Sequence, residues 1–264
     1  MLVSAIIVNH NCSYLTRLCI EALKKSSGDF ELEIIVVDNA SDAENLSYLK
    51  KLHEEKEITL VALQRNTGYG FGNNRGADAA RGDYLLILNP DVVVEKDTVR
   101  KLLHYAQEHS DLGIVAPQLY FYNDQIQDSC RRFMTPLDLV IKRTPLKRLG
   151  RFRARYRHYV MEDFDHSQVQ DVDIVTGACF LISKELFQEL RGFDERFFLF
   201  MEDIDLCRRV WGAGYRVVYY PKARALHSHK RLSGGSFVST LLNRIFWIHV
   251  SSAIKYFWKW KGRS

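Results

Sequence analysis

Short apolar runs alternate with longer stretches of helical periodicity through residues 1–110 of the chain. Each run is short and apolar enough to be a strand that is buried on both faces. The predicted strands are Ser4–Val8, Glu33–Val37, Ile58–Leu63 and Asp83–Leu88. The predicted helices are Tyr14–Lys25, Gly72–Arg81 and Asp97–His109, with one more capped by Ser41 or Asp42. This alternation is typical of βαβ units, so we expect an α/β fold with a mostly parallel central sheet flanked by helices.

The pattern is less regular after residue 110. Strands and helices are still predicted there, but they no longer alternate at a constant spacing. The predicted strands are Asp171–Thr176, Cys179–Ser183 and Tyr215–Tyr220, and the predicted helices are Lys184–Leu190 and Asp203–Gly212.

The C-terminal segment predicts a different kind of helix. From Leu242 onward, apolar residues recur at helical spacing, and basic residues are interleaved with Trp247, Trp258 and Trp260. A cationic helix rich in Trp suits a membrane interface. It also suits a helix that packs on the domain and leaves a solvated basic face, and both can hold at once.

Composition fits a single domain in a reducing compartment. At 264 residues, 47% of them hydrophobic, the chain can bury a substantial core. Its five cysteines are scattered and lack CxxC spacing, which argues against a disulfide framework or a zinc site. The chain opens on a strand-like run without a signal-peptide pattern, and no apolar segment is long enough to cross a bilayer. We therefore expect a cytoplasmic protein.

The formal net charge of +5 is unevenly placed. Eight Lys and Arg residues, and no acid, lie between Lys142 and Arg157. Such a stretch is typical of a solvated or mobile loop. It is also typical of a segment that binds a phosphate-rich partner, an anionic membrane surface or nucleic acid. We expect residues 142–157 to be disordered, or ordered only by a partner.

Polar residues directly follow the predicted strands. Asn9, Asp38 and Arg65 each lie just after one strand, and Asn89-Pro90-Asp91 follows another. Ligands bind at the carboxyl ends of strands in parallel sheets, so these positions are candidates for a site. Asp38 can accept hydrogen bonds from a nucleotide base or ribose. Its alternative role as a helix cap is less needed, because the residues after it supply better caps.

The segment from Arg65 to Asn74 is rich in Gly and Asn and opens a helix. Its glycines, Gly68 among them, let the backbone approach a ligand, and a helix N-terminus favours phosphate. The spacing is not that of the dinucleotide fingerprint, and the segment does not follow the first strand. Taken alone, the segment does not identify a ligand.

Asp91 and His227 are candidate metal ligands. An aspartate at a strand end can bind Mg²⁺ or Mn²⁺, which need few protein carboxylates when phosphates also bind them. Asn-Pro-Asp is equally an ordinary β-turn sequence. His227 can complete a metal site, and Lys230 with the Gly-rich turn that follows suits a diphosphate. His227 and His229, two residues apart, could equally be solvated loop residues.

Three acids follow an apolar run between Phe197 and Arg209. A buried approach desolvates carboxylates and tunes their basicity, as a general base requires. Asp203, at the start of a predicted helix, is the favoured base, and its neighbour Glu202 is the alternative. Asp205 can instead pair with Arg208 or Arg209 on the same helix.

Several short motifs occur in one order along residues 2–236. They are Val8-Asn9-His10-Asn11, Val37-Asp38-Asn39-Ala40-Ser41, Arg65-Asn66-Thr67-Gly68-Tyr69-Gly70, Leu88-Asn89-Pro90-Asp91, Thr176-Gly177-Ala178, Gly192-Phe193-Asp194-Glu195, Glu202-Asp203-Ile204-Asp205 and His227. The ordered set resembles the inverting nucleotide-sugar glycosyltransferases of family 2, which have the GT-A fold. Within that family it is most similar to the bacterial rhamnosyltransferases of surface polysaccharide synthesis.

The resemblance implies roles for individual residues. It implies that the nucleotide sugar is bound by Asn9, Asp38, Arg65, Gly68, Asn89 and Lys230, with Asp38 at the base. It implies a divalent metal, Mg²⁺ or Mn²⁺, on Asp91 and His227, with Asn89 in place of the first acid of the family's DXD motif. It implies that Asp203 is the base, that Glu202 supports it, and that Gly177 and Ala178 border the acceptor.

The resemblance also implies a reaction and a division of the chain. The expected reaction moves L-rhamnose from dTDP-L-rhamnose to a hydroxyl of a glycan or lipid-linked glycan, with a UDP-hexose as the alternative donor. Residues 1–110 form the expected nucleotide-sugar half of a domain over 1–236, residues 111–236 the acceptor half, and residues 237–264 a basic aromatic helix. An anionic membrane surface is an expected partner, at the inner face of the cell membrane, and nucleic acid is not.

Two other functions compete with this interpretation. A sugar-phosphate nucleotidyltransferase uses a related sheet, but a Gly-rich phosphate loop with Arg should follow its first strand, where this chain has Asn9-His10-Asn11. A non-catalytic membrane or nucleic-acid binder would use residues 142–157 and the C-terminal helix. That function leaves the acids at the strand ends unexplained.

Overall fold

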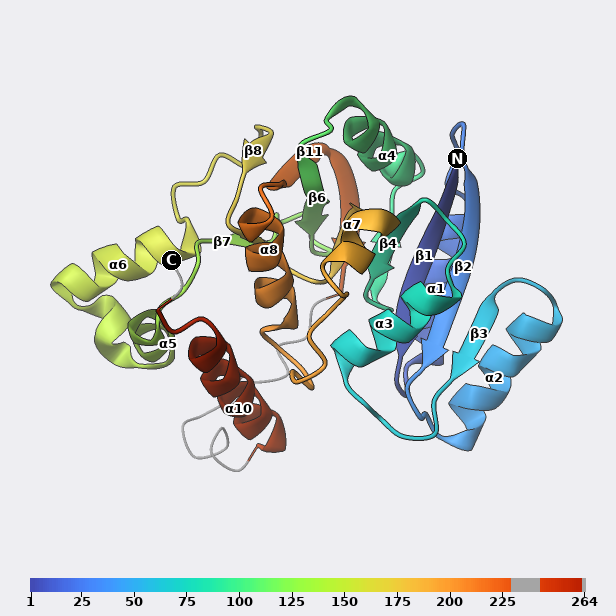
Figure 1. Ribbon diagram of the computed structural model, residues 1–264, viewed down its shortest axis with the longest axis horizontal. Coiled ribbons are helices and arrows are strands. Elements are labelled where there is room, and N and C mark those ends of the chain that lie inside the picture. The colour runs from blue at the N-terminus through green and yellow to red at the C-terminus, as the bar shows by residue number, and fades with distance from the viewer. Residues whose placement is uncertain (229–242, 263–264) are drawn as a thin grey trace.

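The computed structural model describes residues 1–228 and 243–262 and is built on one nine-stranded sheet (Figure 1). The strands lie in the order β3-β2-β1-β4-β10-β6-β11-β5, and β8 pairs with β11. They are β1 (Leu2–Asn9), β2 (Glu31–Asp38), β3 (Thr59–Ala62), β4 (Tyr84–Leu88), β5 (Val92–Val94), β6 (Leu112–Tyr120), β8 (Gln170–Asp171), β10 (Cys179–Ser183) and β11 (Arg216–His227). A small second sheet pairs β7 (Cys130–Arg131) with β9 (Ile174–Val175).

Helices cover both faces of the sheet. They are α1 (Ser13–Lys24), α2 (Ala43–Glu54), α3 (Tyr69–Ala79), α4 (Thr98–Glu108), α5 (Pro136–Arg143), α6 (Gly150–Val160), α7 (Lys184–Glu189), α8 (Glu202–Gly212) and α10 (Arg244–Lys259), with a 3-10 helix over Pro145–Arg148. Alternate residues of β1 point to opposite layers. Val3 and Ile7 pack in the cluster that includes α1, α2 and α4, and Ile6 packs in the cluster that includes α3, α7 and α8.

The parallel sheet predicted for the first half is confirmed. β1 pairs in parallel with both β2 and β4, and β2 pairs in parallel with β3. The register sets Asn9 opposite Asp38 at the carboxyl ends of β1 and β2. The polar residues that follow these strands therefore meet at one edge of the sheet. β10 then lies antiparallel between β4 and β6, so the sheet continues without a break from the first half of the chain into the second.

The second half departs from the sequence prediction in several strands. β6 was not predicted, because Gly113 and Pro117 interrupt its apolar pattern. The single strand predicted over Asp171–Thr176 is wrong: β8 and β9 are separate two-residue strands in different sheets. The strand predicted to end at Tyr220 runs on to His227, and a register shift between Tyr220 and Arg224 accommodates Pro221.

The expectation that residues 142–157 are disordered is wrong. The stretch contains the end of α5, the 3-10 helix and most of α6. Two of its eight cations pair with acids just outside it, which the count of acids within the stretch did not include. Arg155 donates to Asp138 (2.6 Å) in the capping box that starts α5, and Arg157 pairs with Asp163 (3.2 Å). The pair between Arg155 and Asp138 therefore links α6 to α5 within a stretch that looks unpaired in sequence.

The C-terminal helix α10 packs on the domain beside α5 (Figure 1). Ala253 and Tyr256 on its inner side join a third apolar cluster with Phe197, Met201 and Tyr159. In the described parts of the chain, we find no helix with the length and apolar character needed to cross a membrane. Leu242 and Lys230 lie outside the described residues.

Candidate active site

The ends of β1 and β2 form a buried polar network. The side-chain amide of Asn9 donates to Oδ1 of Asp38 (2.9 Å) and to the hydroxyl of Ser41 (3.0 Å). The backbone N–H of Ser41 donates to Oδ2 of Asp38 (3.0 Å), and Thr16 donates to Oδ1 of Asn9 (2.9 Å). The structure brings Asn9 and Asp38 together as expected, but both side chains are fully buried. Their contact with a nucleotide stays a prediction.

Asn39 organises the Gly-rich loop, although the sequence predicted it only as a candidate helix cap. Its amide donates to Oδ1 of Asn66 (3.1 Å) and to the carbonyl of Gly68 (3.2 Å), and its oxygen accepts the N–H of Thr67 (2.9 Å). These bonds fold the loop that opens α3, and Arg65 at its start is exposed. A cationic side chain and a helix N-terminus here suit a phosphate group.

Gly68 brings this loop against the segment before α8. Its φ of +92° lies in the region that favours glycine, and a Cβ at this position would lie 2.1 Å from the carbonyl oxygen of Phe198. The next residue, Tyr69, donates its backbone N–H to that same oxygen (2.9 Å). The Gly-rich loop and the acid-bearing segment, which are far apart in sequence, are therefore in direct contact.

The Asn89-Pro90-Asp91 turn joins β4 to β5 and lies beside the start of β10. The N–H of Asn89 donates to the carbonyl of Ala178 (2.8 Å), which continues the pairing of Cys179 with Leu88. The expected acceptor residues Gly177 and Ala178 are both buried. The expected metal-binding turn and the expected acceptor segment are thus neighbours.

Asp91 and His227 meet because β11 pairs with β5. The register sets His227 opposite Val92, and Nε2 of His227 lies 3.5 Å from Oδ1 of Asp91. Gln127 fixes the ring of His227: its oxygen lies 2.9 Å from Nδ1, and its amide donates to the backbone carbonyl of His227 (2.6 Å). With Nδ1 as the donor to Gln127, Nε2 presents its lone pair towards Asp91.

This pair fits a divalent metal. Neighbouring ligands of one octahedral ion lie about 3 Å apart, close to the separation of Asp91 and His227. Within the described ranges, no group of three or more His, Cys, Asp or Glu side chains is arranged to hold a metal. Mg²⁺ and Mn²⁺ suit such a site with few protein ligands, because diphosphate oxygens and water complete their coordination.

Asp203 lies in the first turn of α8, bonded to the acceptor segment. The N–H of Gly177 donates to Oδ2 of Asp203 (3.0 Å), and the N–H of Ile204 donates to Oδ1 (2.8 Å). The hydroxyl of Tyr69 donates to the carbonyl of Gly177 (2.6 Å) and so braces the same peptide. Burial raises the pKa of Asp203, although these N–H groups and the charge of Lys142 oppose the rise.

Glu202 is the more deeply buried of the two acids, at 4% exposure. Within the described part of the protein, its Oε2 has no hydrogen-bond partner. Burial, and then the neighbouring charge of Asp203, raise the pKa of Glu202 well above its usual range. Asp203 is half-buried and therefore the more accessible carboxylate. The geometry thus favours Asp203 over Glu202 as the candidate proton acceptor.

Asp205 has the structural role predicted for it. It is fully buried and bonds to Arg209 (2.8 Å), one turn along α8. It also accepts hydrogen bonds from Nζ of Lys259, the last residue of α10 (2.8 Å to Oδ2), and from Nε1 of Trp260, which follows it (2.9 Å to Oδ1). The C-terminal helix is therefore attached directly to the helix that carries Asp203.

The same helix holds the backbone that leads into α8. Phe200 and Met201 have φ values of +68° and +71°, a strained conformation for residues with a side chain. Ser252 donates to the carbonyl of Leu199 (2.9 Å), and the ring of His249 stacks on Phe200 with 4.5 Å between centroids. Strained segments persist where surrounding contacts over-determine them, and α10 supplies those contacts here.

Three residues of the site escaped the sequence prediction: Asn39, Tyr69 and Gln127. Asn39 and Tyr69 lie inside motifs that the sequence analysis identified, so their positions could be predicted to be near the site. Their hydrogen-bonding roles could not. Gln127 lies in an irregular segment, and nothing in the sequence links it to His227. Lys230, expected at the diphosphate, lies outside the described residues.

Comparison with known proteins agrees with this arrangement. Residues 4–191 match Glycosyl transferase family 2. The chain is 30% identical over 192 residues to the N-acetylglucosaminyl-diphospho-decaprenol L-rhamnosyltransferase of Mycobacterium tuberculosis, an alignment that covers 67% of this chain and 61% of that protein. It is 26% identical over 270 residues to rhamnosyltransferase WbbL of Escherichia coli K12, covering 97% of this chain and 92% of WbbL.

Solved structures share the arrangement of strands and helices. GalNAc-T7, solved with UDP, GalNAc and Mn²⁺, superposes with a TM-score of 0.64 at 17% identity, over 87% of this chain and 43% of its own. Residues 1–349 of S. aureus TarS in complex with UDP-GlcNAc give 0.59 at 16%, over 91% and 61%. The family match covers most of the chain and the fold is shared with these proteins, so the chain belongs to glycosyl transferase family 2 and has the GT-A fold.

Proposed function

We propose that the protein transfers a sugar from a nucleotide-sugar donor to an acceptor hydroxyl, with inversion at the anomeric carbon. One observation carries the proposal. The neighbouring residues Gly177 and Ala178 are hydrogen-bonded to the two parts of the site that the reaction needs, the proposed base and the turn with the proposed metal ligand. Ala178 accepts from the turn that bears Asp91, and Gly177 donates to Asp203. A leaving-group site and a base site are thereby held on either side of one short segment.

The base acts on the acceptor. As the acceptor oxygen attacks the anomeric carbon, Asp203 takes the hydroxyl proton, and the bond from that carbon to the diphosphate oxygen breaks. The electron pair leaves with the nucleoside diphosphate, and the proton stays on Asp203. Asp91 and His227 would hold the divalent metal, which when bound neutralises the charge that builds on the leaving diphosphate.

The preferred donor is dTDP-L-rhamnose and the preferred acceptor a glycan or lipid-linked glycan of bacterial surface polysaccharide synthesis. The printed names of the M. tuberculosis and E. coli relatives, both rhamnosyltransferases, support this choice. A UDP-hexose is the alternative, because the TarS and GalNAc-T7 structures hold UDP-GlcNAc and UDP. We place the reaction in the cytoplasm, at the inner face of the cell membrane.

Product analysis tests the proposal. The protein is incubated with dTDP-L-rhamnose or a UDP-hexose, Mg²⁺ or Mn²⁺, and candidate acceptors, and the nucleotide products are separated. Acceptor-dependent release of dTDP supports the rhamnosyl donor, and release of UDP supports the alternative. Formation of a nucleoside triphosphate from the donor and pyrophosphate would instead identify a nucleotidyltransferase and overturn the proposal.

A further inference from the structure

The outer face of α10 is apolar and aromatic, with cations at its ends. Residues at three- to four-residue spacing share this face, so they line one side of the helix. They are Arg244, Trp247, Ser251, Ile254 and Trp258, and Lys261 lies just after the end of the helix. Trp247 is 55% exposed, Ile254 65% and Trp258 79%. Large apolar side chains that are grouped on a surface mark a site of interaction.

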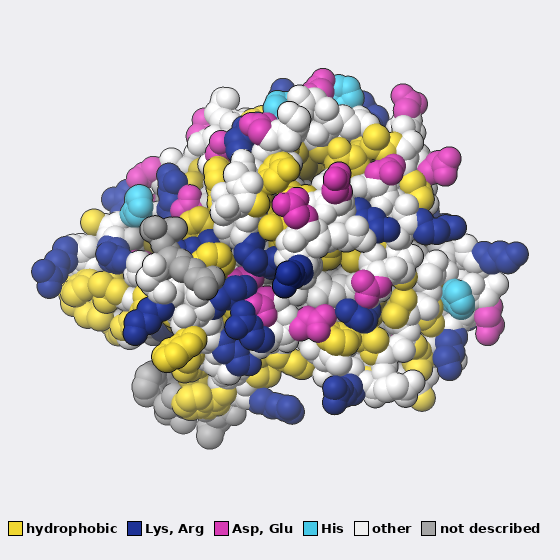
Figure 2. Space-filling view, viewed as in Figure 1, with side chains coloured by type: hydrophobic (Ala, Val, Ile, Leu, Met, Phe, Trp, Pro, Cys, Tyr) yellow, Lys and Arg dark blue, Asp and Glu magenta, His cyan; other side chains and the backbone are white. Residues whose placement is uncertain are grey.

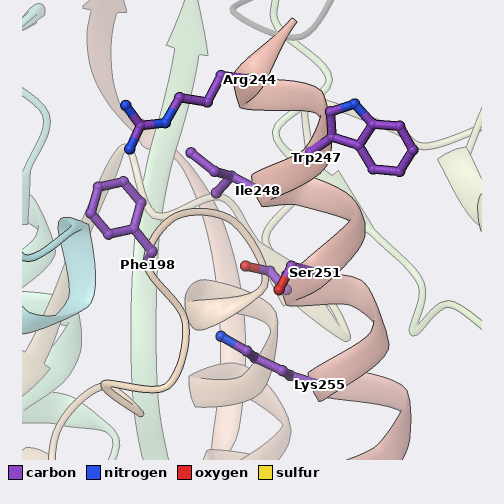
Figure 3. Close-up of a pocket in the computed structure, with 7 residues that line it drawn as sticks. Phe198, Arg244, Trp247, Ile248, Ser251 and Lys255 are labelled. Atoms are coloured by element: carbon purple, nitrogen blue, oxygen red, sulfur yellow. The ribbon is translucent and has the colours of Figure 1, made fainter. Parts of the chain in front are cut away.

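A groove of about 290 Å³ runs along this helix, against the segment that leads into α8 (Figure 3). Phe198, Trp247 and Ile248 give it an apolar lining, and Arg244 and Lys255 lie at opposite ends. The carbonyl of Phe198 also accepts the N–H of Tyr69, so the groove adjoins the candidate active site. An apolar floor between two cations suits an amphipathic anion.

Exposed cations of α5 and α6 form a basic surface next to α10. They include Arg143, Arg151 and Arg153. Arg143 of α5 contacts Nδ1 of His249 (2.5 Å), and its guanidinium lies 5.7 Å from the ring centre of Phe246. Apolar side chains such as Val140 and Leu149 are exposed among the cations. Figure 2 shows Lys and Arg side chains gathered with hydrophobic ones over this end of the molecule.

The combination of exposed cations with exposed apolar and aromatic side chains favours one kind of partner over the others. A second copy of the chain would bring the same cations face to face, and like charges repel. Nucleic-acid phosphates would leave Trp258 and Ile254 without apolar contact. An anionic bilayer provides phosphates for the cations and a headgroup region in which Trp rings are stable.

We propose that the outer face of α10, the groove beside it and the basic surface of α5 and α6 dock together on an anionic lipid bilayer. The helix then lies in the interface plane, with its inner face still bound to the segment that carries Asp203. The proposal deepens the proposed function and rests on it in one respect: a surface-bound enzyme meets a lipid-linked acceptor where that acceptor lies.

Vesicle flotation of the full chain tests the docking without any donor. The probes are vesicles of phosphatidylcholine alone and of phosphatidylcholine mixed with phosphatidylglycerol. We expect binding to the anionic vesicles only, and weaker binding as salt is raised. Arg151→Gln with Arg153→Gln should weaken binding roughly 30-fold, at about a fivefold loss for each cation. Trp258→Ser should weaken it roughly tenfold.

Matched controls separate this surface from general effects. Lys50→Gln with Lys51→Gln changes two exposed cations of α2, at the opposite end of the molecule in Figure 1, and should leave binding unchanged. Tyr122→Ser removes an aromatic side chain that is 66% exposed in another loop, and should also leave it unchanged. Equal binding to both vesicle types, no binding at all, or dimerisation through α10 in sedimentation analysis would overturn the proposal. Calorimetric binding of dTDP to the same variants shows separately whether the proposed function holds.

Discussion

The backbone N–H of Gly177 donates a 3.0 Å hydrogen bond to Oδ2 of Asp203. A Cβ at position 177 would lie 3.2 Å from the Cβ of Asp203, so the absence of a side chain permits this approach. The bond stabilises the ionised form of the carboxylate, while burial favours its neutral form. Burial and the hydrogen bonds from N–H groups therefore act in opposite directions on the pKa of Asp203, and burial has the larger effect.

Asp203→Asn should abolish transfer and leave nucleotide binding intact. Loss of a positioned base costs about a hundredfold or more in kcat, and the amide has no proton-accepting carboxylate. Turnover is measured by nucleoside diphosphate release, and binding by calorimetry. Asp78→Asn, at an exposed acid of α3, is the matched control and should keep wild-type turnover. Near wild-type transfer by Asp203→Asn would remove the assignment.

Glu202→Gln should make the protein more stable at neutral and alkaline pH. Burial and the charge of Asp203 raise the folded-state pKa of Glu202 above its unfolded value of about 4.3. The wild type therefore has its full stability below that unfolded pKa, and loses this contribution as pH rises through the folded pKa. A glutamine does not ionise, so its advantage should vanish near pH 4 and grow as pH rises, to several kcal/mol near pH 8.

Urea denaturation of Glu202→Gln and wild type across this pH range measures the effect. A constant difference at every pH would show that the variant acts through packing rather than ionisation.

Gln127→Ala should weaken metal binding about 10- to 100-fold, as loss of an orienting partner does at metal sites. The His227 ring loses the group at Nδ1 that fixes its orientation. Mn²⁺ titration in the presence of nucleoside diphosphate measures the affinity. Gln125→Ala, two residues away and exposed, should not change it. Unchanged Mn²⁺ affinity in Gln127→Ala would argue against His227 as a ligand.

Lys259→Met should destabilise the protein by about 1–3 kcal/mol, because Asp205 is fully buried and loses one of its charge partners. Asp194, which Lys259 also binds (2.7 Å), loses the same partner. Lys261→Met removes an exposed cation two residues away and should be nearly neutral. Chemical denaturation compares the two, and equal midpoints would contradict the role of Lys259.

Gly68→Ala should destabilise the protein by about 2 kcal/mol and reduce turnover, since a methyl group meets the carbonyl of Phe198 and the φ is positive. Gly212→Ala is the control. A Cβ at Gly212 meets nothing within 4 Å at the end of α8, so this change should be neutral or slightly stabilising. Thermal denaturation separates the two, and similar melting temperatures would contradict the contact.

Periodicity predicted the part of the fold that depends on local pattern. The strands β1, β2 and β4 are continuous apolar runs, so the strand-end positions Asn9 and Asp38 could be named from sequence. The pairing of Asp205 with Arg209 was also predictable, because residues four apart share a helix face.

The rest depended on contacts between distant segments. Asp91 meets His227 only through the antiparallel register of β5 and β11, and Gln127 reaches His227 across 100 residues of sequence. Arg155 in the charged stretch pairs with Asp138, which lies outside that stretch. A pattern within one segment does not contain such pairings.

The contacts that α10 makes with the segment before α8 have a consequence for evolution. Ser252 binds the backbone carbonyl of Leu199, and Lys255 binds that of Arg196 (2.8 Å). Carbonyl oxygens are present whatever the side chain, so neither contact depends on the identity of the residue it holds. The exposed positions of this segment, such as Phe198, can mutate without loosening it. Side chains on the surface of this segment can therefore vary by single substitutions while the backbone that leads to Asp203 keeps its place.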